Sequence, residues 1–106
     1  MSAWTDVAAV AELPPGGCQR LDVDGVAVAV FNVEGRYYAI EDVCSHEAET
    51  LSGGPVYGLE ITCPRHEARF SLVTGEALSP PAYEPIAVFP VRVEAGRVQV
   101  RDDRFD

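Results

Sequence analysis

The chain has 106 residues, 47% of them hydrophobic, and a formal net charge of -9. This length and apolar content predict a single folded domain over residues 1–106, and they argue against a disordered chain. The acidic balance argues against nucleic acid and anionic membrane surfaces as partners, because both require a basic face. With no apolar run near the roughly 20 residues of a membrane span and no visible secretory signal, we expect a cytoplasmic protein.

Short runs rich in valine and aromatic residues predict an all-β fold. In chain order these runs are Cys18–Val23, Val26–Asn32, Arg36–Glu41, Val56–Thr62, Ala68–Leu72, Ala87–Glu94 and Arg97–Arg101. Asp24-Gly25, Glu34-Gly35 and Ala95-Gly96 fall between runs, as hairpin turns do. The segment Thr5–Glu12 is ambiguous between helix and strand. Many short strands with regular turns predict a small antiparallel sandwich or a partly open barrel.

The last two runs show the clearest alternation of apolar and polar residues. Their valines are spaced as in strands with one buried face, at Val91, Val93, Val98 and Val100. A helix is excluded from the same part of the chain by the prolines Pro80, Pro81, Pro85 and Pro90.

Two segments carry both histidines and two of the three cysteines of the chain. The first is Cys44-Ser45-His46, which follows a predicted strand, and the second is Cys63-Pro64-Arg65-His66, at the tip of a predicted hairpin. Two thiolates and two imidazoles from two loops predict a metal site. In a cytoplasmic protein, paired cysteines favour a metal over a disulfide. The third cysteine, Cys18, is expected to be an ordinary small side chain.

Two kinds of metal centre use this set of ligands. Structural zinc sites take two cysteines and two histidines, but zinc loops more often carry cysteines two residues apart. A Rieske 2Fe-2S centre has two histidines in place of two cysteines on one iron. The order Cys-x-His, a loop, Cys-Pro-x-His and a phenylalanine resembles the Rieske signature, at Cys44, His46, Cys63, Pro64, His66 and Phe70. We therefore favour one Rieske-type 2Fe-2S cluster per chain, with a structural zinc module as the alternative.

The resemblance to the Rieske family covers roughly the whole chain from Cys18 onward. Further segments that resemble the family are Tyr38–Asp42, Leu51–Gly54, Phe70–Ala77 and the proline loop Pro80–Tyr83. The resemblance implies a cluster-binding part of two loops at about residues 42–82. One position departs from the family, which usually has glycine directly after the second histidine, where this chain has Glu67.

The resemblance also assigns the ligands. Cys44 and Cys63 would hold one iron, and His46 and His66 would hold the other. A cluster whose ligands all come from the protein leaves no open position for a substrate, so we expect an electron carrier rather than an enzyme.

The surroundings of the cluster predict a low potential. High-potential relatives carry a disulfide between the two loops, and its positions here are Glu49 and Arg65. Negative charge at Glu47, Glu49 and Glu67 opposes reduction, so we expect a midpoint near about -150 mV. Glu41, Asp42 and Glu49 are expected on a solvated acidic surface, with a docking rim for partners as the alternative.

Among Rieske proteins, oxygenase large subunits continue into a catalytic domain for which this chain is too short. The resemblance then implies a soluble, stand-alone ferredoxin of a ring-hydroxylating dioxygenase system in aromatic hydrocarbon catabolism. Such a protein carries single electrons from an NADH-dependent flavoprotein reductase to a terminal Rieske oxygenase, through transient docking. A protein similar to the small subunit of nitrite reductase is the remaining alternative.

Overall fold

The computed structural model describes residues 3–44, 50–64, 67–80 and 82–104, and it confirms the all-β prediction. In chain order the elements are β1 (Thr5–Ala9), the 3₁₀ helix η1 (Val10–Glu12), β2 (Cys18–Val23), β3 (Val26–Val33), β4 (Arg36–Glu41), β5 (Val56–Tyr57), β6 (Glu60–Thr62), β7 (Arg69–Ser71), β8 (Val88–Phe89), β9 (Val91–Glu94) and β10 (Arg97–Val100). In the part of the chain so described, no helix has the length and hydropathy needed to cross a membrane.

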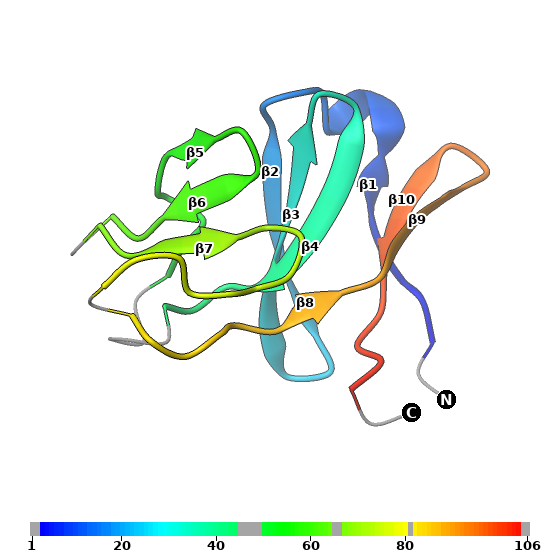
Figure 1. Ribbon diagram of the computed structural model, residues 1–106. Helices are drawn as coiled ribbons and strands as arrows, with labels where there is room; N and C mark the ends of the chain where they lie inside the picture. Colours follow the sequence, from blue (N-terminus) through cyan, green and yellow to red (C-terminus); the bar gives the residue numbers. More distant parts are fainter. Residues whose placement is uncertain (1–2, 45–49, 65–66, 81, 105–106) are drawn as a thin grey trace.

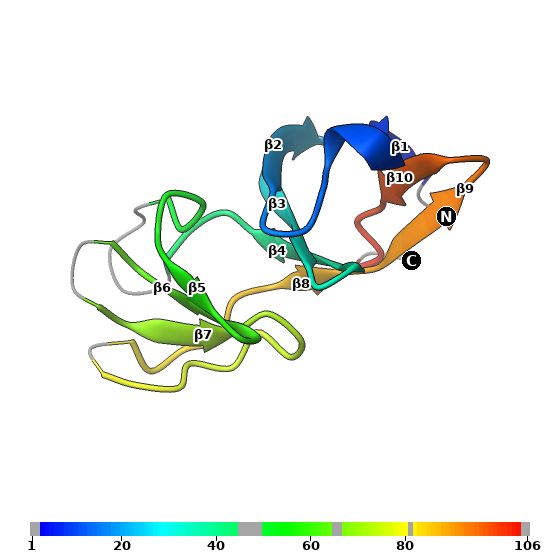
Figure 2. The ribbon, with the colours of Figure 1, turned by 90° about the horizontal axis from the view of Figure 1, so that it is seen from above.

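The strands form three antiparallel sheets rather than a closed barrel (Figure 1). The terminal sheet has the order β1-β10-β9, the central sheet β2-β3-β4-β8, and the small sheet β5-β6-β7. Seen from above, the central sheet lies between the other two (Figure 2). The chain begins and ends in the terminal sheet, because β1 pairs with β10.

Strand β3 shows why the central sheet is covered on both sides. Val28 and Val30 pack into one cluster of buried side chains, and Ala29 and Phe31 pack into another. Since successive side chains of a strand point to opposite faces, the two clusters lie on opposite faces of this sheet. We call them the terminal core, which includes Leu13, Val98 and Val100, and the small-sheet core, which includes Ile61 and Phe70.

The three predicted dipeptide turns are confirmed. Each joins two neighbouring antiparallel strands, β2 to β3, β3 to β4 and β9 to β10. Two-residue hairpin loops of this hand need positive φ at both central residues. The pairs adopt it at Asp24 and Gly25 (φ 51 and 86), Glu34 and Gly35 (54 and 91) and Ala95 and Gly96 (52 and 77).

Three expectations needed correction. The run Val56–Thr62 is two strands, because the chain turns at Gly58, which has φ 60. The run Ala87–Glu94 is divided at Pro90, where the chain leaves the central sheet for the terminal sheet, since proline cannot donate to a ladder. Val93 is 49% exposed rather than buried, whereas Val98 and Val100 are buried as expected.

Candidate metal centre

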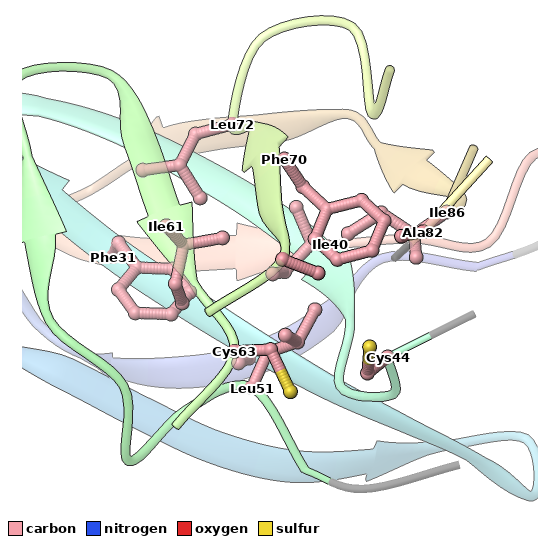
Figure 3. Packing of buried hydrophobic residues seen from close by; sticks show 12 residues of the cluster. Phe31, Ile40, Cys44, Leu51, Ile61, Cys63, Phe70, Leu72, Ala82 and Ile86 are labelled. Atoms are coloured by element: carbon pink, nitrogen blue, oxygen red, sulfur yellow. The ribbon is translucent and has the colours of Figure 1, made fainter. Parts of the chain in front are cut away.

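Cys44 and Cys63 come from two different sheets into one buried cluster. Cys44 follows β4 of the central sheet after two residues, and Cys63 follows β6 of the small sheet directly. Both side chains are 1% exposed and belong to the small-sheet core. In Figure 3 the sulfur atoms of both cysteines lie on the side of the labelled residues opposite Leu72. The structure therefore places the two thiols, which the sequence predicts to share one site, in the same buried core.

The second loop has the predicted position at the tip of a hairpin. Strands β6 and β7 pair in register, with Thr62 opposite Arg69. Inside the loop, the Cys63 N–H donates to the Ala68 carbonyl at 2.7 Å, and the Glu67 N–H donates to the Cys63 carbonyl at 3.0 Å. These bonds fix the backbone of Cys63 from both sides.

Glu67 occupies the position where the Rieske resemblance leads us to expect glycine. Its φ is 61, in the left-handed region. A residue with a Cβ is strained there by roughly 1–2 kcal/mol, whereas glycine is not. The glutamate thus adds backbone strain at this position of the loop.

The first loop depends on Asp42, a residue that the sequence analysis assigned to an acidic surface. That expectation was wrong, because the Asp42 side chain is 0% exposed. Its carboxylate accepts hydrogen bonds from the Leu51 and Ser52 backbone N–H groups, both at 2.8 Å. It also accepts from the Ser52 hydroxyl and pairs with Arg20. The partners lie 9 to 22 residues away in sequence, so a pattern among neighbouring residues does not indicate these contacts.

The described part of the site supplies two soft sulfur donors in an apolar setting. That donor set fits an iron–sulfur or zinc centre better than a magnesium or calcium site, which would need oxygen ligands. The predicted ligands His46 and His66 lie outside the described residues. So do several neighbours named in the sequence analysis, which are Ser45, Glu47, Glu49, Arg65 and Pro81. The four-residue ligand set accordingly stays a prediction.

Cys18 differs from the two site cysteines. It is exposed, at the start of β2. Partial burial and the nearby Asp42 carboxylate raise the pKa of its thiol to about 11, although Arg20 acts in the opposite direction. A thiol with this pKa is almost fully protonated at neutral pH and is a poor nucleophile or metal ligand.

The connection between β7 and β8 carries exposed apolar side chains. Ala82 is buried in the same core as the two cysteines, and its neighbour Tyr83 is 82% exposed. Leu78 lies before Ala82 and Tyr83 on the same connection between β7 and β8. It is 41% exposed. The connection thus exposes apolar side chains on both sides of a residue that is buried in the same core as the two thiols.

The comparisons with known proteins agree with this geometry. The Rieske [2Fe-2S] domain family matches residues 3–90. The naphthalene 1,2-dioxygenase system ferredoxin component of Pseudomonas aeruginosa is 39% identical over 97 residues, which are 92% of this chain and 93% of that protein. The fold of this chain is also similar to that of the ferredoxin of carbazole 1,9a-dioxygenase from Nocardioides aromaticivorans IC177. The TM-score is 0.89 and the identity 34%, and the match covers 94% of this chain and 98% of that one.

A second solved structure contains a related ferredoxin together with its partner. It is the complex of reduced oxygenase and oxidized ferredoxin in carbazole 1,9a-dioxygenase, with a TM-score of 0.87, 37% identity and coverage of 92% of both chains. The matched ferredoxin components are electron carriers, not catalysts, and the cofactor of the matched domain is a Rieske-type 2Fe-2S cluster. By the extent of the domain match and the identity to these relatives, the chain belongs to the Rieske [2Fe-2S] family.

Proposed function

We propose that this chain is the ferredoxin component of a ring-hydroxylating dioxygenase system. In this role it takes single electrons from an NADH-dependent flavoprotein reductase and delivers them to a terminal Rieske oxygenase. The observation that carries the proposal is the 39% identity to a naphthalene dioxygenase ferredoxin over 92% of this chain and 93% of that one. The chain matches that ferredoxin along nearly the whole of both sequences, rather than as one domain of a larger enzyme.

The ligand set of the proposal is Cys44 and Cys63 on one iron and His46 and His66 on the other. When bound, the cluster accepts one electron and later gives up one electron, so each delivery returns it to its oxidised state. The two buried cysteines support the assignment, because the small-sheet core shields their sulfur atoms from water. Residues 42–82 would form the cluster-binding part of a single domain that spans residues 1–106.

The surroundings of the site fit transient docking. The exposed side chains of Leu78 and Tyr83 lie on the segment that enters the site core. An apolar centre with charged surroundings suits a complex that must form quickly and separate again. The net charge of -9 favours partners that present a basic face at the contact. The oxygenase complex of a related ferredoxin supports the terminal oxygenase as one partner.

The proposal places the protein in the cytoplasm. Cysteines that serve as iron ligands must stay reduced until the cluster is assembled, and the cytoplasm maintains that state. NADH, the proposed source of electrons, is consumed on the same side. We expect a strain that exports the protein to lose dioxygenase activity, and a strain that keeps the protein in the cytoplasm to have normal dioxygenase activity.

The test begins with the spectrum of the purified protein. We expect iron and acid-labile sulfide in equal amounts, visible absorption that bleaches with dithionite, and an electron paramagnetic resonance signal typical of mixed nitrogen and sulfur ligation. The midpoint should lie near about -150 mV, and a value above zero contradicts the low-potential assignment.

Electron transfer is tested next with purified partners. NADH and a dioxygenase reductase should reduce the protein, and the reduced protein should support single-turnover oxidation by a terminal oxygenase. A colourless protein with stoichiometric zinc would favour the zinc module instead. Normal cluster content with no reduction by any dioxygenase reductase would favour a role similar to that of the nitrite reductase small subunit.

A further inference from the structure

The carboxylate of Asp42 is buried at the point where the chain leaves β4 for the first ligand loop. Its side chain is 0% exposed, and an isolated charge in such a place would cost several kcal/mol. Four donors compensate for its burial. They are the backbone N–H groups of Leu51 and Ser52, the Ser52 hydroxyl and the Arg20 guanidinium.

These hydrogen bonds close the first loop. Asp42 lies two residues before Cys44, and its hydrogen-bond partners Leu51 and Ser52 lie just after the loop. One oxygen, Oδ1, accepts both backbone N–H groups at 2.8 Å. The two ends of the loop are therefore held together by a side chain rather than by a strand ladder.

The same contacts continue to the second loop. The Gly54 N–H donates to the Leu51 carbonyl at 2.9 Å, and the Thr62 N–H donates to the Pro55 carbonyl at 3.0 Å. Gly54 also packs so closely on Thr62 that an added Cβ would lie 1.8 Å from the Thr62 carbonyl oxygen. Thr62 directly precedes Cys63. A continuous path of short contacts thus runs from Asp42 to the second cysteine.

We propose that Asp42 is a positioning residue that sets the spacing of the Cys44 and Cys63 thiols before and during cluster binding. The carboxylate anchors the exit of the first loop, and that exit segment in turn fixes the entry of the second. Arg20, from β2, holds the carboxylate in place on its other oxygen. The inference rests on the proposed assignment of Cys44 and Cys63 as ligands.

The test compares Asp42→Asn with Asp102→Asn in the cluster-loaded protein. The asparagine at position 42 places an NH₂ group among four donors and removes the charge that pairs with Arg20. Outer contacts that orient metal ligands typically change metal affinity about 10- to 100-fold. We therefore expect cluster loss to a chelator, followed by visible absorption, to be about 10- to 100-fold faster than in the wild type.

Two further measurements separate positioning from general stability. Hydrogen exchange of the Leu51 and Ser52 amides should accelerate in Asp42→Asn, and the g-values of the reduced cluster should shift. Asp102 is a matched control, because it is also a buried carboxylate that pairs with an arginine, but it follows β10 in the terminal sheet. Asp102→Asn should leave the cluster lifetime, both amides and the g-values at wild-type values.

Each outcome decides the inference. Wild-type cluster lifetime and g-values in Asp42→Asn would overturn it while leaving the proposed function intact. The same changes in both variants would also overturn it, since the effect would then not be specific to the loops. Absence of any cluster in the wild type would overturn the ligand assignment and this inference together. If Asp42→Asn does not fold, Ser52→Ala removes one of the four donors and should shorten the cluster lifetime a few-fold, and an unchanged lifetime would overturn the inference.

Discussion

Strands β2, β3 and β4 of the central sheet run for 6, 8 and 6 residues, whereas β5, β6 and β7 of the small sheet run for 2, 3 and 3. The central sheet is covered on both faces by apolar side chains, so burial and long ladders stabilise it. Ladders as short as those of the small sheet contribute little on their own. Its geometry depends instead on individual contacts, among them the Asp42 hydrogen bonds and the approach of Gly54 to Thr62.

This contrast indicates that the stability of the fold and the binding of the cofactor depend on different regions of the molecule. We expect the terminal sheet to tolerate substitutions with a general cost in stability and little effect on the cofactor. The small sheet, the two loops and the end of β4 that leads to Cys44 are expected to control the spacing of the two thiols. Matched pairs of variants, one in each region, test this contrast.

The largest effect is expected at the cysteines. Cys44→Ser or Cys63→Ser removes a proposed thiolate ligand and should abolish the 2Fe-2S cluster, measured as iron and acid-labile sulfide per chain. Cys18→Ser is the control, since Cys18 lies in the central sheet and is exposed. It should retain a full cluster. A normal cluster in Cys63→Ser would show that the second loop uses another ligand.

The next pair removes one leucine from each core. Leu51 in the small-sheet core is 0% exposed, and Leu13 in the terminal core is 2% exposed. Leu→Ala at either site should lower the free energy of unfolding by about 2–5 kcal/mol, as measured by denaturant titration followed by far-UV circular dichroism. Only Leu51→Ala should also shorten the lifetime of the cluster. Equal lifetimes in the two variants would remove the distinction between the regions.

Adjacent glycines in the segment after the first loop give a sharper comparison. An added Cβ at Gly54 would meet the Thr62 carbonyl oxygen at 1.8 Å, whereas at Gly53 no described atom lies within 4 Å. Gly54→Ala should therefore destabilise the protein by roughly 1–3 kcal/mol or more and weaken cluster retention, measured as in the leucine pair. Gly53→Ala should behave like the wild type. Equal behaviour of both variants would contradict the close contact between Gly54 and Thr62.

A smaller gain is expected from restoring glycine after the second predicted histidine ligand. Glu67→Gly relieves the left-handed strain at φ 61, and the added freedom of the unfolded chain offsets part of the benefit. The net gain should be a few tenths to about 1 kcal/mol, measured by thermal unfolding. Removal of the negative charge should also raise the midpoint potential. Glu67→Gln is the control for the charge alone, because it keeps a side chain at the left-handed position, and a lower melting temperature in Glu67→Gly would contradict the strain argument.

The smallest effect concerns acid stability in the terminal region. The Arg104 guanidinium beside Asp102 holds the pKa of that carboxyl below its ordinary value of 3.8. A carboxyl with a lowered folded pKa adds stability that is present above the unfolded pKa of about 3.9 and is lost as pH falls through the folded pKa. Wild-type stability should therefore decline more steeply below about pH 4 than that of Asp102→Asn. Parallel unfolding curves from pH 5 to pH 2 would contradict the role of this pair.

Local signals in the sequence accounted for most of the scaffold. Alternation and hairpin dipeptides gave the bounds of β2 and β4 correctly, because strands and two-residue turns are specified by neighbouring residues. The same reasoning treated Val93 as buried, since alternation indicates two faces but not whether a second layer covers one of them. The interruption at Pro90 could have been inferred from the missing N–H, and the turn at Gly58 from its glycine.

The site was likewise predictable in part from neighbouring residues and in part not. The two ligand segments predicted one site that takes both Cys44 and Cys63; the two residues are buried in one core, and their role as ligands stays a prediction. Asp42 was misassigned because its partners come from β2 and from beyond the loop, at sequence separations that no local pattern records. The chain has no lysine and few arginines with which a carboxylate could pair. From the sequence alone, a buried and paired aspartate beside a ligand segment could therefore not be distinguished from a solvated one.

The pairing of β1 with β10 has a practical consequence for electrochemistry. Both chain ends emerge from the terminal sheet, on the far side of the central sheet from the small sheet (Figures 1 and 2). A linker attached to either end would immobilise the molecule on an electrode with the small sheet turned toward solution. The proposed cluster site would then be open to docking partners, and the body of the molecule would separate it from the electrode.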